Sequence, residues 1–145
     1  MGTHSGAVHG DSTLRLVALL GTIAGAFLIT DIAIITITNS HIEPLDSILF
    51  FIGLAAMVLT IVALVVHLSE GRAGLSRVGY AVLAFVGIVL IMGAISAVAD
   101  RIGRTVFSPA NIGLHGEWSF FVTAIMVLII AGWAARSAAA RGGSD

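Results

Sequence analysis

The sequence predicts an all-α polytopic membrane protein with four transmembrane helices. Hydrophobic residues make up 58% of the 145-residue chain, and charged residues make up only 10%. A soluble domain carries about 25% charged residues, so this chain lacks the polar surface needed to face water on all sides. The apolar residues gather in four long runs, each close to the roughly 20 residues that a helix needs to cross a bilayer. Because lipid cannot hydrogen-bond to an irregular backbone, we expect these runs to be helical.

The first predicted span, residues 14–38, contains a single acidic side chain, Asp31. A charge near the centre of a membrane-spanning helix costs roughly 2.5–3.5 kcal/mol on insertion scales. Asp31 should therefore face protein, water or an ion rather than lipid. One interpretation is a proton or cation site. The other is a structural acid bonded to a side chain on a neighbouring helix, for which the sequence offers Arg101, Arg104, Ser96 and Thr123.

The other three spans are predicted at residues 45–68, 78–99 and 118–135. Pro44 directly precedes the second span and suits the first turn of a helix, because the N–H that proline lacks would be unpaired there. The polar segments at residues 1–13 and 136–145 are predicted to be tails, and we expect the first to be flexible. The four spans then form one transmembrane domain over residues 14–135, without a soluble domain.

Arginine is distributed unequally between the two predicted sides of the membrane. Five arginines fall on the side of both termini, namely Arg15, Arg72, Arg77, Arg136 and Arg141, and two fall on the other, Arg101 and Arg104. Cytoplasmic segments carry the excess of basic residues. The sequence therefore predicts a multi-pass protein of the cell (inner) membrane with both termini in the cytoplasm.

Small residues recur four positions apart in three of the predicted spans, as Gly21 with Gly25, as Gly93 with Ala97 and as Ala131 with Ala135. Such pairs let helix backbones approach closely, and close packing drives helix association in lipid. At about 100° per residue, the first pair lies roughly 80–120° around its helix from Asp31. The first span therefore offers two separate contact faces, used either within the chain or in an oligomer.

The two halves of the chain show a faint ordered correspondence. Asp31 and a His-x-Glu sequence at His41 and Glu43 match, in order, Asp100 and a second such sequence at His115 and Glu117. This would be a parallel repeat of two helices each, related by an axis along the membrane normal. It would place Asp31 near the outer end of its helix. Chance matching in a sequence of low diversity is the alternative.

The polar residues on the side opposite the termini are the candidates for function. We single out four of them as functional polar candidates: Asp31, Asp100, Arg101 and Arg104. The two His-x-Glu pairs offer imidazole and carboxylate ligands of the kind that zinc, copper or iron accepts. The candidate metal ligands are His41, Glu43, His115 and Glu117, but the pattern is common in loops, so no metal is predicted.

Several function classes receive no support from the sequence. The chain has no cysteine, which excludes disulfides and thiolate sites. It also lacks a phosphate-binding glycine loop or a nucleophile motif, so we expect no catalytic site. The net charge of −1 gives no sign of nucleic acid. No cofactor is predicted. A haem bound to His67 would need a second histidine at similar depth as its other axial ligand, and the sequence offers none. A quinone against the outer aromatic residues is an alternative.

Three functions remain. The leading hypothesis is a non-catalytic integral subunit that contacts the lipid bilayer and packs into a larger membrane complex or a homo-oligomer. The alternative is a small transporter or channel that handles protons or cations through Asp31 and the outer polar residues. A further alternative is a redox-linked membrane anchor that contacts quinone or a haem shared between subunits.

Overall fold

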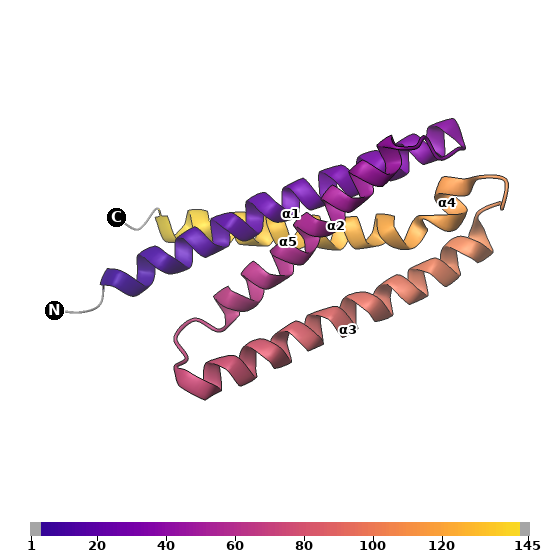
Figure 1. Ribbon diagram of the computed structural model, residues 1–145. Helices are drawn as coiled ribbons and strands as arrows, with labels where there is room; N and C mark the ends of the chain where they lie inside the picture. Colours follow the sequence, from indigo (N-terminus) through magenta and orange to yellow (C-terminus); the bar gives the residue numbers. More distant parts are fainter. Residues whose placement is uncertain (1–3, 143–145) are drawn as a thin grey trace.

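The helices of the protein form an elongated bundle (Figure 1). The computed structural model describes residues 4–142, and side chains from Ser12 to Arg141. The elements are α1 (His4–Thr38), α2 (Leu45–Leu68), α3 (Gly74–Val106), α4 (Ile112–Gly116) and α5 (Trp118–Gly142), with no strand in this range. The segments long and apolar enough to cross a membrane are Ser12–Thr38, Leu45–Leu68, Gly74–Val106 and Trp118–Arg141. The predicted all-α polytopic fold class is thus confirmed.

Three helices extend beyond the predicted spans. α1 begins at His4 rather than at residue 14, and α5 continues to Gly142. α3 begins at Gly74 and continues to Val106, where the sequence predicted a loop. The part of α3 beyond residue 99 contains an ion pair between Asp100 and Arg104, which lie four residues apart, and such pairs stabilise a helix. Residues 1–3 and 143–145 of the predicted tails lie outside the described residues.

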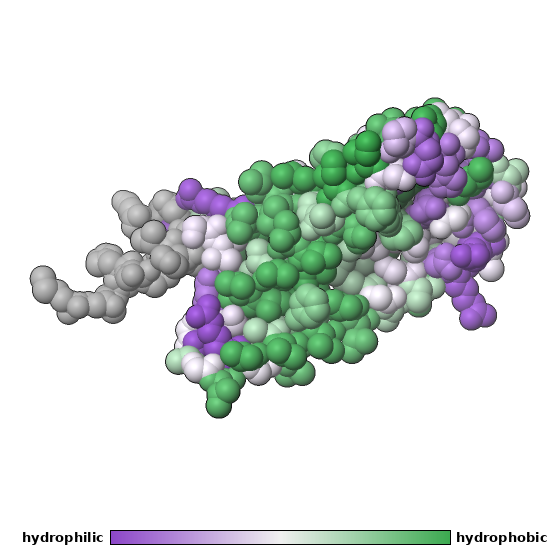
Figure 2. All heavy atoms as spheres, viewed as in Figure 1, coloured by the Kyte–Doolittle hydropathy of each residue, from purple (hydrophilic) through white to green (hydrophobic). Residues whose placement is uncertain are grey.

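The two ends of the bundle differ in what they carry. The start of α1, the end of α5 and the α2–α3 connection lie at one end, and α4 lies with the α1–α2 connection at the other, which we call the α4 end (Figure 1). Figure 2 shows polar residues at both ends and a broad apolar band between them. The functional candidates of the sequence are therefore to be sought at the α4 end.

α1 is the central helix, in contact with both α2 and α5. Buried positions recur along it every three or four residues, as expected for one helix face: Leu14, Val17, Gly21, Ala24, Leu28, Asp31 and Ile35, with the buried Gly25 and Ile32 beside them. A Cβ added at Gly21 would lie 2.9 Å from the Cβ of Ala131 on α5, and one added at Gly25 would overlap Leu128. Both glycines thus serve contacts within the chain.

α3 is the least buried helix. Only 6% of its most apolar 18-residue stretch is buried inside the protein, compared with 39% of the corresponding stretches of α1 and α2. Figure 1 shows it set apart from the group formed by α1, α2 and α5. Gly93 has no atom within 4 Å of an added Cβ, and Ala97 is exposed. The second small-residue pair therefore makes no close helix contact within the described chain.

Asn39 joins the two connections at the α4 end. It follows α1 with a positive φ of 49°, a conformation that asparagine tolerates better than most side chains. Its side-chain Nδ2 donates to the carbonyl of Ala110 at 2.7 Å, and its Oδ1 accepts from the N–H of Ile112 at 2.9 Å. This pair of hydrogen bonds ties the α1–α2 connection to the segment that begins α4.

Candidate functional site

A cavity of about 280 Å³ opens at the α4 end of the bundle. It is lined by α1, the α1–α2 connection, the first turns of α2 and the start of α5. Its lining combines four carboxylates, one imidazole, one hydroxyl, three phenyl rings and an aliphatic side chain: Asp31, Glu43, Asp46, Glu117, His41, Ser47, Phe50, Phe51, Phe120 and Ile35. We call it the acidic pocket.

Asp31 lies in the row of otherwise apolar buried positions on α1. It is only 4% exposed and precedes the helix end at Thr38 by seven residues, or about 10 Å of helix. None of the described residues hydrogen-bonds to its Oδ1. A buried carboxylate oxygen without a hydrogen-bond partner is energetically costly. An ionised acid is therefore unfavourable at this position unless a ligand binds to it.

The partners expected for a purely structural Asp31 are engaged elsewhere. Ser96 and Thr123 hydrogen-bond to each other, with their hydroxyl oxygens 2.7 Å apart. The Nε of Arg104 donates to Asp100 Oδ2 at 2.9 Å, and the side chain of Arg101 is exposed. The hypothesis of a bond from Asp31 to one of these four residues therefore finds no contact in the structure.

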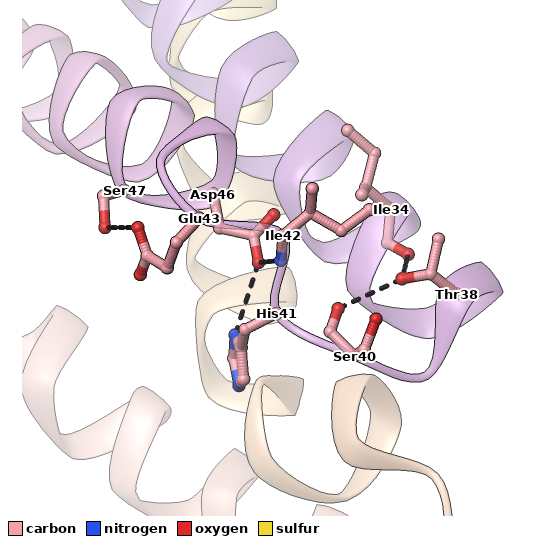
Figure 3. A network of polar contacts seen from close by, with 8 residues as sticks. All are labelled: Ile34, Thr38, Ser40, His41, Ile42, Glu43, Asp46 and Ser47. Carbon is pink, nitrogen blue, oxygen red and sulfur yellow. Dashed lines mark hydrogen bonds and ion pairs between the residues drawn. The ribbon is translucent and has the colours of Figure 1, made fainter.

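Asp46 is the second buried acid of the pocket, also 4% exposed. Figure 3 shows its Oδ2 accepting from the backbone N–H of Ile42 at 2.7 Å, with the Nδ1 of His41 3.4 Å away. These contacts hold the α1–α2 connection against the first turn of α2. The other oxygen, Oδ1, is buried without a hydrogen-bond partner among the described residues. Two carboxylates of the pocket therefore each keep an unused acceptor.

Glu43 and Glu117 complete the acidic lining. Glu43 is exposed and accepts from the hydroxyl of Ser47 at 2.6 Å (Figure 3). Glu117 lies between α4 and α5, just before the segment that is apolar enough to span a membrane. Burial raises the pKa of the Glu117 carboxyl above its usual 4.5, and the neighbouring His41 imidazole acts in the opposite direction. The ionised form of Glu117 is thus disfavoured at this position.

The pocket has an excess of negative charge. Four carboxyl groups face one imidazole, and no lysine or arginine is among the lining residues. Such a concentration of one sign of charge in a hollow attracts ions of the opposite sign. The phenyl rings add a second cation-attracting feature: Phe50 meets Phe51 and Phe120 edge to face, with ring centroids 5.6 and 5.2 Å apart.

The two His-x-Glu pairs do not come together as one ligand set. His41, Glu43 and Glu117 line the pocket, whereas the Nδ1 of His115 lies 3.0 Å from the carbonyl oxygen of Phe107. Within the described side chains, no group of three or more His, Cys, Asp or Glu residues is arranged to hold a metal ion. The metal interpretation of these pairs therefore gains no support from the geometry.

Sequence reasoning left out two residues that shape this end of the molecule. Asp46 was not among the singled-out candidates, although its place in the first turn of a span, four residues after Ile42, is a signal of backbone capping. Asn39 carried no signal for its contacts, because Ala110 and Ile112 lie more than 70 positions further along the chain. Distant pairings of this kind depend on the fold.

The fold and the pocket define a class, a four-span α-helical protein with an acidic cavity at one end. Comparison with protein-family models, with curated proteins and with solved structures gives no match for this chain. Function is therefore argued from the pocket itself.

Proposed function

We propose that the chain is a small membrane transporter or channel that handles cations or protons through the acidic pocket. The observation that carries this proposal is the buried carboxyl of Asp31: the residue lines the cavity, and its Oδ1 has no hydrogen-bond partner among the described residues. An intramembrane acid with an unused oxygen is relieved when a proton or a cation binds to it. Asp46, with its own unused Oδ1, is a second ligand group in the same cavity.

The acidic pocket favours this proposal over the non-catalytic subunit that composition alone favours. A structural acid is expected to be satisfied by its neighbours, since buried polar groups nearly always are. Asp31 and Asp46 instead keep buried, unused acceptor oxygens in the wall of a hollow that has no basic residue other than His41.

Ion flux into liposomes tests the proposal. We expect reconstituted protein to conduct protons or a small cation, and Asp31→Asn to lower the rate by about tenfold or more, because the amide cannot carry the charge or the proton. Asp100→Asn is the matched control: it removes a carboxylate at the same end of the bundle that pairs with Arg104 outside the pocket. Equal flux for the wild type and Asp31→Asn, with both proteins assembled alike by size-exclusion chromatography, would refute the proposal.

For the arrangement in the membrane, we propose that both termini face the cytoplasm and the acidic pocket faces outward, as the arginine distribution indicates. The chain has no cysteine, so a single Ser108→Cys substitution in the exposed α3–α4 connection gives a clean label. We expect a membrane-impermeant maleimide to react in intact cells. Reaction only after lysis would invert the orientation.

α3 favours a second role, as the surface through which the protein joins other membrane subunits or further copies of itself. Only 6% of the apolar stretch of α3 is buried, and large apolar side chains along it are exposed, namely Leu83, Leu90 and Val98. Such a face can pack against another helix in the membrane. Native mass spectrometry of the protein released in mild detergent tests this, and a monomer without partners would refute it.

A further inference from the structure

A second cavity lies beside the acidic pocket and is almost wholly apolar. It measures about 340 Å³ and lies between α2 and α3, with contributions from α1 and α5. Its walls include Leu28, Met57, Phe85, Met92 and Gly93. We call it the apolar cavity.

The hydroxyl groups of the apolar cavity are already satisfied. Those of Ser96 and Thr123 lie 2.7 Å apart, and the Thr123 hydroxyl also lies 2.8 Å from the carbonyl oxygen of Ser119. With these groups paired, the cavity suits a hydrocarbon better than water, because water needs several polar partners to enter.

The two cavities share a wall. Phe120 lines both of them. On α1, Leu28 of the apolar cavity and Asp31 of the acidic pocket are three residues apart, which places them one turn from each other on the same side. On α2, Phe50 and Leu54 repeat this arrangement, with Phe50 in the acidic pocket and Leu54 in the apolar cavity. The polar and apolar hollows therefore follow one another along the bundle.

We propose that the two cavities together form a binding site for an amphipathic organic cation, an ammonium group with a hydrocarbon tail. The proposal rests on the cation-handling function proposed above and names its substrate class. The ammonium group lies among Asp31, Asp46 and Glu117, and the tail passes Phe120 into the apolar cavity. Carboxylates supply opposite charge, and the rings of Phe50 and Phe51 can face a quaternary ammonium, which aromatic side chains bind well.

The size and chemistry of the acidic pocket also favour an organic cation over a metal ion. The pocket holds about 280 Å³, whereas one water molecule occupies about 30 Å³ in the liquid. A bare metal ion would leave most of this space and all three phenyl rings unused. The described side chains also present no cluster of ligands arranged for a metal.

Equilibrium dialysis of the full chain in zwitterionic lipid nanodiscs, corrected with protein-free nanodiscs, tests the proposal with three probes. These are tetramethylammonium, hexyltrimethylammonium and hexyl sulfate. Each methylene buried from water is worth about a fourfold gain in affinity, so the hexyl cation should bind at least about tenfold more tightly than tetramethylammonium. The hexyl sulfate anion, which carries the same tail, should bind at least about tenfold more weakly than the hexyl cation.

Two pairs of variants separate the head site from the tail site. Asp31→Asn should weaken both cations about tenfold, whereas Asp100→Asn should leave both unchanged. Gly93→Leu projects a side chain from a wall of the apolar cavity, where an added Cβ meets nothing within 4 Å. It should remove the advantage of the hexyl tail without affecting tetramethylammonium. Gly79→Leu makes the same change in open space on α3, away from the cavity, and should have no effect.

The outcomes distinguish this inference from the proposed function. Equal affinities of the two cations, or a tail advantage that survives Gly93→Leu, would overturn the amphipathic site while cation handling stands. Hexyl sulfate binding as tightly as the hexyl cation would likewise overturn it. Failure of Asp31→Asn to weaken either cation would reject Asp31 as the head site. Because Asp31→Asn can affect folding, Glu117→Gln at the rim of the pocket provides a second head-group variant with the same expected direction.

Discussion

The two helical hairpins of the chain each contain an aspartate near the α4 end, and the two acids have opposite environments. Asp31 on α1 is 4% exposed, and its Oδ1 has no hydrogen-bond partner among the described residues. Asp100 on α3 is partly exposed and pairs with Arg104 on its own helix. The sequence correspondence that aligns these two acids does not extend to their surroundings.

Packing explains this contrast. α1 lies against α2 and α5 through Gly21 and Gly25, so any side chain on its inner face is enclosed by protein. α3 stands further out and leaves its acid within reach of solvent (Figure 1). A carboxylate can satisfy itself locally on an exposed helix, but on an enclosed one it depends on what the neighbouring helices provide. The enclosed hairpin is therefore where an unsatisfied acid marks a site.

The largest expected effect comes from breaking the close packing of the first hairpin. Gly25→Val should destabilise the protein by about 2–3 kcal/mol, because a Cβ there overlaps the side chain of Leu128 on α5, which must repack. Gly79→Ala on α3 should be neutral or stabilising by about 0.5–1 kcal/mol, since alanine favours the helix and meets open space. Unfolding in detergent, followed by tryptophan fluorescence, measures both. Similar losses for the two variants would mean that the hairpins are equally packed.

The second effect concerns the acids themselves. Asp31→Asn should raise the free energy of unfolding at neutral pH by about 1–2 kcal/mol, because it removes a buried charge that has an unused oxygen. Asp100→Asn should lower it by about 0.5 kcal/mol or less, the usual value of an exposed i,i+4 ion pair. The same unfolding measurement without added cation compares them. A loss of stability in Asp31→Asn would indicate that the carboxylate is stabilised by a contact made as an ion.

Much of the fold could be predicted from the sequence. Hydropathy and length identified the four spans, because a bilayer demands helices of roughly that length. The ends of α1, α3 and α5 were predicted less well, because helices continue past the apolar region that hydropathy detects. The sequence also could not predict that α3 packs loosely against the other helices. Its apolar segment is as hydrophobic as the others, and hydropathy does not distinguish contact with lipid from contact with protein.

The site could be predicted only in part. The cost of a charge in lipid pointed to Asp31, and the sequence offered His41, Glu43 and Glu117 only as candidate metal ligands. That these residues line one pocket with Asp46, while His115 turns to Phe107, depends on how α4 and the connections fold. For the outer aromatic residues the sequence suggested only a quinone contact, and three of their phenyl rings line the pocket.

The third effect tests the link between the two hairpins. Asn39→Gly keeps the positive φ but removes both side-chain hydrogen bonds to the α4 segment, and should cost about 1 kcal/mol. Asn39→Asp is the control, because it retains an acceptor for the N–H of Ile112 and should cost less than Asn39→Gly. Hydrogen exchange at the amide of Ile112 reports the link directly. Unchanged protection there in Asn39→Gly would mean that other contacts hold α4 in place.

The smallest effect is the pH dependence contributed by Glu117. Burial raises its pKa above 4.5 in the folded protein, so the folded state binds this proton more tightly than the unfolded state does. Stability from this group is therefore present below pH 4.5 and is lost as the pH rises through the raised value. Glu117→Gln lacks this loss, and its melting temperature should exceed that of the wild type by roughly 1–2 °C at pH 7, a small gain because the group is partly solvated.

Melting curves of the two proteins between pH 4 and pH 7 check this prediction. Four other titratable groups face Glu117 in the pocket: Asp31, Glu43, Asp46 and His41. All four are present in both proteins, so the difference between the curves reports mainly on Glu117. The gap should open as the pH rises. A difference in melting temperature that is widest at pH 4 and closes toward pH 7 would contradict the prediction. It would show that ionised Glu117 stabilises the fold, as a partner of His41, rather than being destabilised by its burial.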